Sequence, residues 1–179
     1  MENNKDRSGW LQVVQVAGFF LGGILAIPLA IGISAGSTLH ATLGFIGSIL
    51  IFQPFATAAG ILLGIPPVPI LLIMISIGIS VIFIFFGICD LFSEKSAWLR
   101  AHLDKVDAIA KRSALFQKYG IITLIPFIWV PGVGLYGCVL LSWLFGWKDL
   151  KGISIILAGW MLAVLLVLGA SLGAMEVIT

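Results

Sequence analysis

The longest uncharged stretch of this chain runs from Ser8 to Cys89 without one Asp, Glu, Lys or Arg. Two shorter uncharged stretches follow, Tyr119 to Trp147 and Gly152 to Met175. A helix needs about 20 apolar residues to cross the hydrocarbon core of a bilayer, where a charged side chain is costly. Hydrophobic residues make up 60% of the sequence and charged residues only 10%. The sequence therefore predicts an all-α integral membrane protein with a single membrane domain.

The basic residues indicate which loops face the cytoplasm. They lie in three groups: near the N-terminus, between residues 95 and 118, and at Lys148 and Lys151. Cytoplasmic loops are enriched in Lys and Arg, so all three groups are expected on the cytoplasmic side. The net charge of +2 is too small and too dispersed to indicate binding to nucleic acid. Between successive basic groups the chain must cross the membrane an even number of times.

The first uncharged stretch has room for two crossings and a surplus. Four crossings of about 20 residues each would leave nothing for loops. We therefore predict spans at 13–34 and 69–92, with a re-entrant hairpin at 38–68 that enters from outside. Gln53 and Pro54 lie at the middle of this hairpin, where proline removes a backbone donor and breaks the helix.

The second uncharged stretch is too short to cross twice. A single crossing would place Lys148 and Lys151 outside, against the charge bias. We predict that 119–147 forms a second re-entrant hairpin, entering from the cytoplasm and broken near its centre by prolines, and that 152–173 is a full span. On this topology the N-terminus is cytoplasmic and the C-terminus lies outside.

The two predicted hairpins share the pattern Pro-x5-Gly, as Pro54–Gly60 and Pro131–Gly137. Each pattern lies inside a hairpin that precedes a full span, and the hairpins enter from opposite sides. Inverted repeats with helices broken at the midplane are a transporter architecture. The tips of the hairpins are then expected to meet near mid-membrane. Two ordinary Pro-kinked spans are the alternative.

The segment 93–118 is the strongly polar part of the chain. Leu99, Leu103, Val106 and Ala110 recur at steps of three and four, which is typical of one apolar stripe on a helix. We expect an amphipathic helix on the cytoplasmic membrane surface, with basic residues toward lipid phosphates. A solvated connector is the alternative.

The start of the chain also resembles a secretory signal peptide, because basic residues precede an apolar stretch. That stretch, 13–34, is longer than the core of about 7 to 15 residues in a signal peptide, so we expect a retained span. Cleavage at the small residues 34–37 is the alternative.

Ionisable side chains that could do chemistry are nearly absent from the predicted hydrocarbon stretches. Asp90 and Glu176 lie at ends of spans and are expected to face water, and His40 is expected at the outer surface. Cys89 and Cys138 lack metal-ligand spacing and are expected to be buried thiols. No motif of a known catalytic class is present. We therefore expect neither an enzyme nor a cofactor or metal site.

What remains for binding is the backbone at the breaks. Freed N–H groups at the start of a helix can hold an anion without any basic side chain, and glycines let a ligand approach closely. The alternative is that these glycines only permit tight helix packing. The candidate substrate-binding residues are Gln53, Pro54, Thr57, Pro126, Trp129, Pro131, Gly132, Gly134, Tyr136 and Gly137.

The stretch from Lys118-Tyr-Gly120 through Pro131-Gly-Val-Gly134 to Gly137, continuing to Leu144-Phe-Gly146, resembles the signature of the small multidrug-export family. That family is distantly related to the DedA/VTT membrane proteins. Leu63-Gly-Ile-Pro-Pro67 is similar to the end of the family's first hairpin. The resemblance covers roughly residues 50–173. It implies paired re-entrant hairpins and a transport role.

One departure from the family concerns charge. Relatives usually place charged residues in the first hairpin, whereas Phe52, Gln53, Pro54 and Thr57 offer none here. Proton coupling through a hairpin carboxylate is therefore not expected.

Two functions compete. The first is a small transporter or lipid translocator that moves an amphipathic or lipid-linked molecule between the two hairpins. The second is a non-transporting scaffold or substrate-binding subunit of a larger membrane complex. Membrane lipids are expected partners of either. The small size of the chain favours a homo-oligomer or a further partner.

Overall fold

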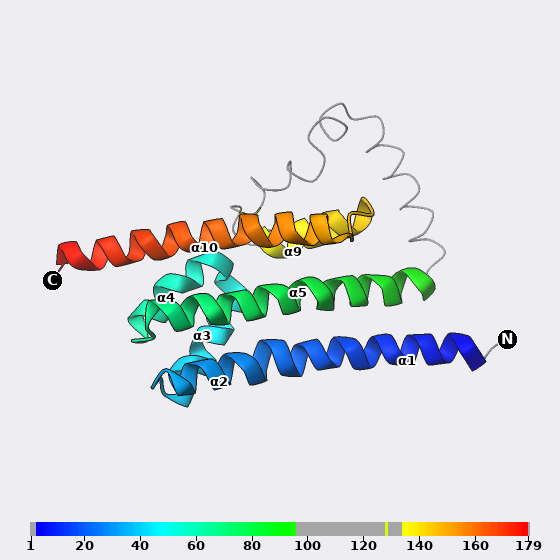
Figure 1. The fold of residues 1–179 in the computed structure, drawn as a ribbon, viewed down its shortest axis with the longest axis horizontal. Helices are drawn as coiled ribbons and strands as arrows, with labels where there is room; N and C mark the ends of the chain where they lie inside the picture. The colour runs from blue at the N-terminus through cyan, green and yellow to red at the C-terminus, as the bar shows by residue number, and fades with distance from the viewer. Residues whose placement is uncertain (1–2, 96–127, 129–133, 179) are drawn as a thin grey trace, which may run out of the picture.

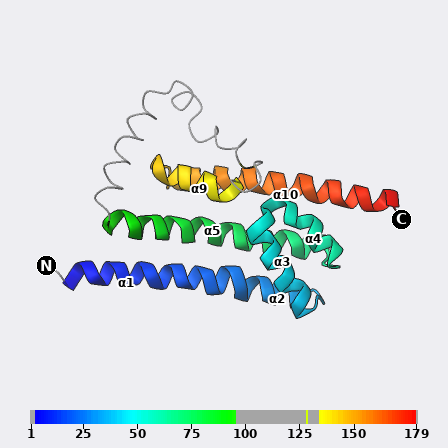
Figure 2. The same cartoon turned by 180° about the vertical axis from the view of Figure 1, so that it is seen from behind.

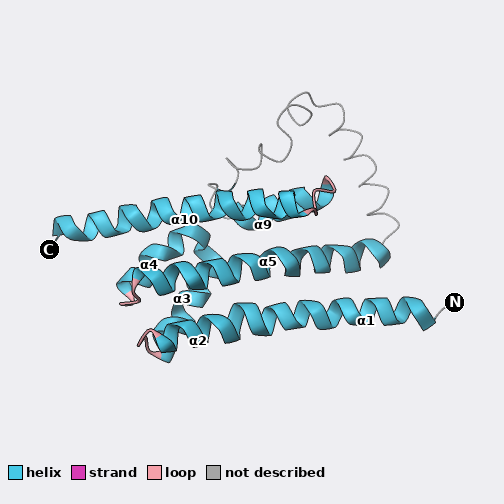
Figure 3. Cartoon of the chain, viewed as in Figure 1, coloured by secondary structure: helices cyan, strands magenta, loops and turns pink. Residues whose placement is uncertain are grey.

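The computed structural model describes residues 3–95, 128 and 134–178, and in these ranges every regular element is a helix (Figure 3). One long helical segment comes first, made of α1 (Asn3–Gly18), the π-helix η1 (Phe19–Ala26) and α2 (Ile27–Ser34). Then follow α3 (Leu39–Phe52), the 3₁₀ turn η2 (Gln53–Phe55), α4 (Ala56–Leu62) and α5 (Pro67–Lys95). The last two are α9 (Gly134–Leu144) and α10 (Leu150–Ile178). The predicted all-α class is confirmed for this part of the chain.

In the part of the chain that the structure describes, four helical segments are long and apolar enough to cross a membrane. They are Gln12–Ser34, Leu39–Leu62, Pro67–Phe92 and Leu150–Ala174. The spans predicted at 13–34, 69–92 and 152–173 lie within three of them. A chain with several such segments is a membrane protein, as its composition indicates.

The segment Leu39–Leu62 is bent back on itself at η2. A Cβ atom added to Gly60 of α4 would fall 2.8 Å from Cε2 of Phe45 in α3, so the two helices lie against each other. Pro54 cannot donate a backbone hydrogen bond, which ends the helical ladder at this point. In Figures 1 and 2, α3 begins and α4 ends at the end of the bundle where α2 ends and α5 begins.

The opposite end of the bundle gathers the start of α1, the end of α5 and the turn from α9 to α10 (Figures 1 and 2). Lys148, in that turn, forms an ion pair with Asp90 of α5. Asp90 was expected to face water, and its side chain is in fact 37% exposed and held by this partner.

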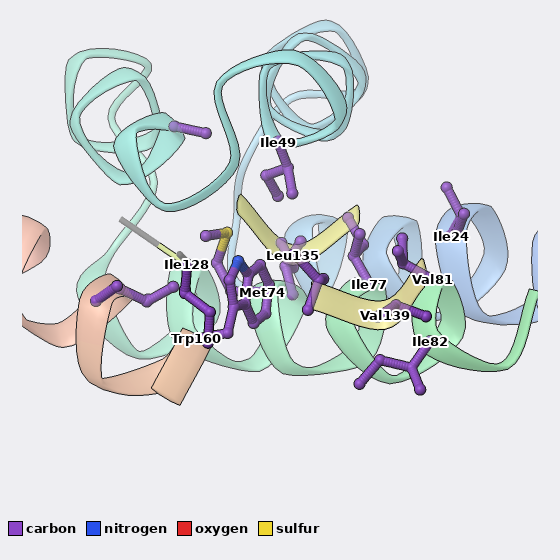
Figure 4. Close-up of a cluster of buried hydrophobic side chains, with 14 of the residues drawn as sticks. Ile24, Ile49, Met74, Ile77, Val81, Ile82, Ile128, Leu135, Val139 and Trp160 are labelled. Atoms are coloured by element: carbon purple, nitrogen blue, oxygen red, sulfur yellow. The ribbon is translucent and has the colours of Figure 1, made fainter. Parts of the chain in front are cut away.

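Helix α5 is the centre of the packing. It lies between the α1–α2 segment and α10 in both views (Figures 1 and 2). Its buried side chains recur at helical spacing, and Trp160 of α10 packs against it at Gly78. Figure 4 shows part of this core. Its labelled members are Ile24, Ile49, Met74, Ile77, Val81, Ile82, Ile128, Leu135, Val139 and Trp160.

The π-helix η1 was not predicted from the sequence. Pro28 has no N–H to donate to the carbonyl of Ile24, so ordinary helical bonding is interrupted just after η1 ends. The wider turn is stabilised from outside, because the hydroxyl of Ser76 donates to the carbonyl of Gly23 at 2.9 Å. Phe19 also stacks on Phe83 with ring centroids 4.9 Å apart.

Some of the predicted elements lie outside the described residues. This applies to the surface helix beyond residue 95 and to most of the first half of the second hairpin. Ile128 is described and is buried in the core. Helix α5 runs to Lys95, beyond the predicted end of its span.

The contact of Gly78 with Trp160 yields a prediction about stability. A Cβ at position 78 would lie 2.3 Å from Cζ3 of the Trp160 ring, and Trp160 is only 1% exposed. Gly78→Ala should therefore lower the free energy of unfolding by about 1 to 3 kcal/mol. Thermal unfolding of the detergent-purified protein measures this. Gly169→Ala in α10 is the control, since a Cβ there meets nothing within 4 Å. Equal stability of the two variants would contradict the prediction.

Candidate functional site

Gln53 stands at the break between α3 and η2 in a backbone conformation that is rare for a side chain. Its φ is 55° and its ψ is −125°, and its side chain is 5% exposed. Residues before proline are driven out of the helical region, which explains why the helix stops here. A positive φ costs energy in any residue other than glycine, so something else must hold Gln53 in place.

The start of α9 supplies that interaction. The Oε1 atom of Gln53 accepts a hydrogen bond from the backbone amide of Leu135 at 2.9 Å. The first backbone N–H groups of a helix have no hydrogen-bond acceptor within the helix. The side-chain oxygen of the residue just before the helix commonly accepts from one of them. Here the cap comes from a residue 82 positions earlier in the chain. The break after α3 and the start of α9 are therefore joined directly.

Gly134, the first residue of α9, permits this approach. An ideal Cβ at this position would fall 1.7 Å from Oε1 of Gln53, and its φ is +29°. Both the close approach and the backbone angle favour glycine. The close neighbour of Gly134 in this structure is thus the side chain of Gln53.

A second hydrogen bond joins the same two segments, and here the side chain comes from α9 and the backbone group from α3. Because Pro54 lacks an N–H, the carbonyl of Leu50 has no helical donor four residues on. The hydroxyl of Tyr136 donates to that carbonyl at 2.7 Å. The ring of Tyr136 stacks on Phe85 of α5, with centroids 5.3 Å apart. Tyr136 therefore satisfies a backbone group that the break in α3 exposes.

The other predicted residues of the first hairpin are buried, and Thr57 forms a hydrogen bond within the hairpin. The hydroxyl of the fully buried Thr57 donates to the carbonyl of Pro54 at 2.9 Å. Pro54 is itself buried in η2. The Nε2 atom of Gln53 is buried and has no hydrogen-bond partner among the described residues. It is the polar group at this site that a ligand could use.

The predicted residues of the second hairpin are placed only in part. Gly134, Tyr136 and the half-buried Gly137 lie in the first turn and a half of α9. Pro126, Trp129, Pro131 and Gly132 lie outside the described residues.

Sequence reasoning missed a charged cluster at the end of the bundle where α9 turns into α10. Trp143 donates its indole N–H to Oδ1 of Asp90 at 2.7 Å, and Lys148 contacts the same oxygen. The ammonium of Lys148 also lies 5.1 Å from the centroid of the Trp143 ring. The sequence did offer a signal for this pair, since Asp90 and Lys148 have opposite charges and each lies close to an end of a predicted span.

Gln53→Met tests the capping bond. Methionine keeps the length of the side chain but removes the acceptor, leaving the Leu135 amide buried without a partner. The free energy of unfolding should fall by about 1 to 3 kcal/mol in a thermal or denaturant titration. Gln15→Met, the same change at an exposed position of α1, should cause no loss. A Gln53→Met protein as stable as the Gln15→Met protein would show that the bond contributes nothing.

The sequence was also compared with known proteins. Residues 54–166 match the family described as "Putative small multi-drug export protein". The matched range runs from the break at η2 through α4, α5 and α9 and over much of α10. No curated protein and no solved structure matches the chain. Since the match covers more than half of the chain, this membrane protein belongs to the putative small multi-drug export protein family.

Proposed function

We propose that this protein is a small exporter or lipid translocator, which moves an amphipathic or lipid-linked molecule across the membrane between two opposed re-entrant hairpins. Family membership and the four apolar helical segments support a membrane exporter. The observation that carries the proposed mechanism is the pair of bonds between the breaks, from Leu135 to Gln53 and from Tyr136 to Leu50.

Helix length supports the re-entrant arrangement. At 1.5 Å per residue, the 14 residues of α3 extend about 21 Å and the 7 residues of α4 about 10 Å. The 11 residues of α9 extend about 16 Å. None of these helices alone crosses a hydrocarbon core of about 30 Å. The tips that meet at Gln53 and Gly134 would then lie inside the membrane.

The contact between the tips supports a gate. Gln53 and Gly134 lie so close that a methyl group does not fit between them. A substrate can pass this level only when the tips part. On parting, the carbonyl of Leu50 and the amide of Leu135 lose their partners, and a polar group of the substrate can replace them. The unpartnered Nε2 of Gln53 is a further donor for that group.

The charge bias supports the orientation. The end of the bundle that carries Lys148 and Lys151 is assigned to the cytoplasm, and the opposite end, with the α2–α3 and α4–α5 turns, to the outside. The N-terminus is then cytoplasmic and the C-terminus outside. The first hairpin enters from outside and the second from the cytoplasm.

Cysteine labelling tests this topology. His40 in the first turn of α3 and Pro66 in the turn after α4 are exposed, and Lys148 is exposed at the other end of the bundle. Single cysteines at these positions, in a Cys89→Ala/Cys138→Ala background, are treated with a membrane-impermeant thiol reagent in intact cells. Positions 40 and 66 should label from outside and position 148 should not. Labelling of position 40 and position 66 from opposite sides would mean that 39–62 crosses the membrane, and the re-entrant hairpin would be wrong.

A disulfide between the tips tests the gate. The ideal Cβ of Gly134 lies 2.7 Å from Cδ of Gln53, which is two bonds from the Cβ of that residue. Cysteines at positions 53 and 134 are therefore within reach of a disulfide. In the same cysteine-free background, oxidation with copper phenanthroline should abolish transport in reconstituted vesicles, and reduction should restore it. Transport is measured with ethidium and with a fluorescent phospholipid that is back-extracted by albumin.

The controls for this experiment separate the gate from the rival function. Vesicles with Gln53→Cys alone, which keeps Gly134, should transport equally before and after oxidation. Full transport by a cross-linked sample would remove the gate. Wild-type vesicles that move neither probe, together with a protein that copurifies from membranes, would favour the scaffold or binding subunit.

A further inference from the structure

A polar cavity lies at the end of the bundle that carries Lys148. Its volume is about 220 Å³. Helix α1, helix α5 and the turn before α10 form its walls. Among the described residues, its polar lining consists of Gln12, Gln15, Asp90 and Lys148, and its apolar lining includes Phe83 and Phe86.

The cavity lies at the ends of three membrane-length segments. Gln12 is the first residue of one such segment, and Asp90 lies two residues before the end of another, at Phe92. Lys148 lies two residues before the last such segment, which starts at Leu150. Helix α1, helix α5 and the turn before α10 thus bring polar side chains together where these segments end. The ends of spans are the level at which the headgroups of lipids and of amphipathic molecules reside.

The charges in the cavity are paired and held in place. Trp143 donates to Oδ1 of Asp90 at 2.7 Å, and its ring lies 5.1 Å from the Lys148 ammonium. The Asp90–Lys148 ion pair therefore has a fixed position beside the cavity. Gln12 adds a buried side-chain oxygen with no hydrogen-bond partner among the described residues.

The net charge of this lining decides which ligand it fits. A simple cation attracted by Asp90 would be repelled by Lys148, and a simple anion would be repelled by Asp90. A molecule that carries an ammonium and a phosphate side by side can lie antiparallel to the ion pair, so that each of its charges faces the opposite one. The Gln12 oxygen and Asp90 can accept from a primary ammonium, and Lys148 can donate to a phosphate.

We propose that this cavity binds an amine–phosphate zwitterion, the headgroup chemistry of phosphatidylethanolamine. The apolar wall formed by Phe83 and Phe86 would take the first carbons of the attached chain. This inference deepens the proposed transport function by naming the headgroup that is carried. Binding is measured without transport, so the failure of one claim is distinguishable from the failure of the other.

Native mass spectrometry of the detergent-purified full chain tests the proposal. The protein is titrated with short-chain phosphatidylethanolamine and with phosphatidylglycerol of the same chain length. The zwitterionic lipid should bind at least about tenfold more tightly, the equivalent of one charged hydrogen bond. This is a demanding result, since the excess of basic residues at this end favours the anionic lipid by itself. Equal binding, or tighter binding of phosphatidylglycerol, would overturn the proposal.

Charge variants locate the site. Asp90→Asn leaves Lys148 without its counter-charge and should reverse the preference in favour of phosphatidylglycerol. Lys148→Gln should weaken phosphatidylethanolamine binding about tenfold by removing the phosphate partner. Asp149→Asn and Lys151→Gln are matched controls at exposed positions outside the cavity lining, and each should keep the wild-type preference. If Asp90→Asn and Lys148→Gln also keep it, the lipid binds elsewhere and the proposal is wrong.

Two additions complete the experiment. If either variant unfolds in detergent, the double variant Asp90→Asn with Lys148→Gln removes both charges, keeps an oxygen for the Trp143 N–H and should lose the zwitterion preference. A folded double variant that keeps the preference would contradict the charge argument. Water-soluble glycerophosphoethanolamine distinguishes the sources of the headgroup. Competition by this compound assigns the site to a free zwitterion as well, and its failure to compete assigns the site to the lipid.

Discussion

The need to satisfy backbone polar groups away from water governs the centre of this protein. Pro54 removes one donor from the helix and leaves the carbonyl of Leu50 without a partner, and the start of α9 leaves the amide of Leu135 without one. Each group is bonded by a side chain of the other segment, Tyr136 for the first and Gln53 for the second. The break after α3 and the start of α9 therefore stabilise each other. Without these bonds, each segment would bury an unpaired backbone group, which costs about 1 to 3 kcal/mol.

Helix α5 provides the frame that holds these breaks in register. Phe85 of α5 stacks on Tyr136, so the hydroxyl that reaches Leu50 comes from a ring already fixed on the central helix. Gly78 lets the ring of Trp160 approach α5 and thereby positions α10. Close contacts at glycine recur where helices cross, whereas Gly169 faces open space. Gly78 therefore permits a close contact between two helices, and Gly169 does not.

The sequence was sufficient to predict the helical membrane class, because long uncharged segments have few other stable structures. It also placed an interruption at Gln53–Pro54 and named Gln53, Gly134 and Tyr136 as site residues. The specific bonds among them were not predictable, since nothing in the local sequence relates Gln53 to a residue 82 positions away. The π-helix followed from Pro28 only in retrospect. The Asp90–Lys148 pair was missed because the positive-inside rule treats lysines as markers of topology and ignores their partners.

The two polar regions differ in chemistry in the way that their proposed depths in the membrane require. The central one uses a neutral amide and a phenol, and the peripheral one uses a carboxylate and an ammonium. A charged side chain at the centre of a span costs about 2.5 to 3.5 kcal/mol on insertion scales, whereas the border of the membrane lets charges remain hydrated. A zwitterion held at the border would keep its charges paired there. At the level of the breaks it would meet only hydrogen-bonding groups among the described residues. The protein would then assist passage by offering the zwitterion one hydrogen-bonding group after another. A carboxylate in the first hairpin would not be required.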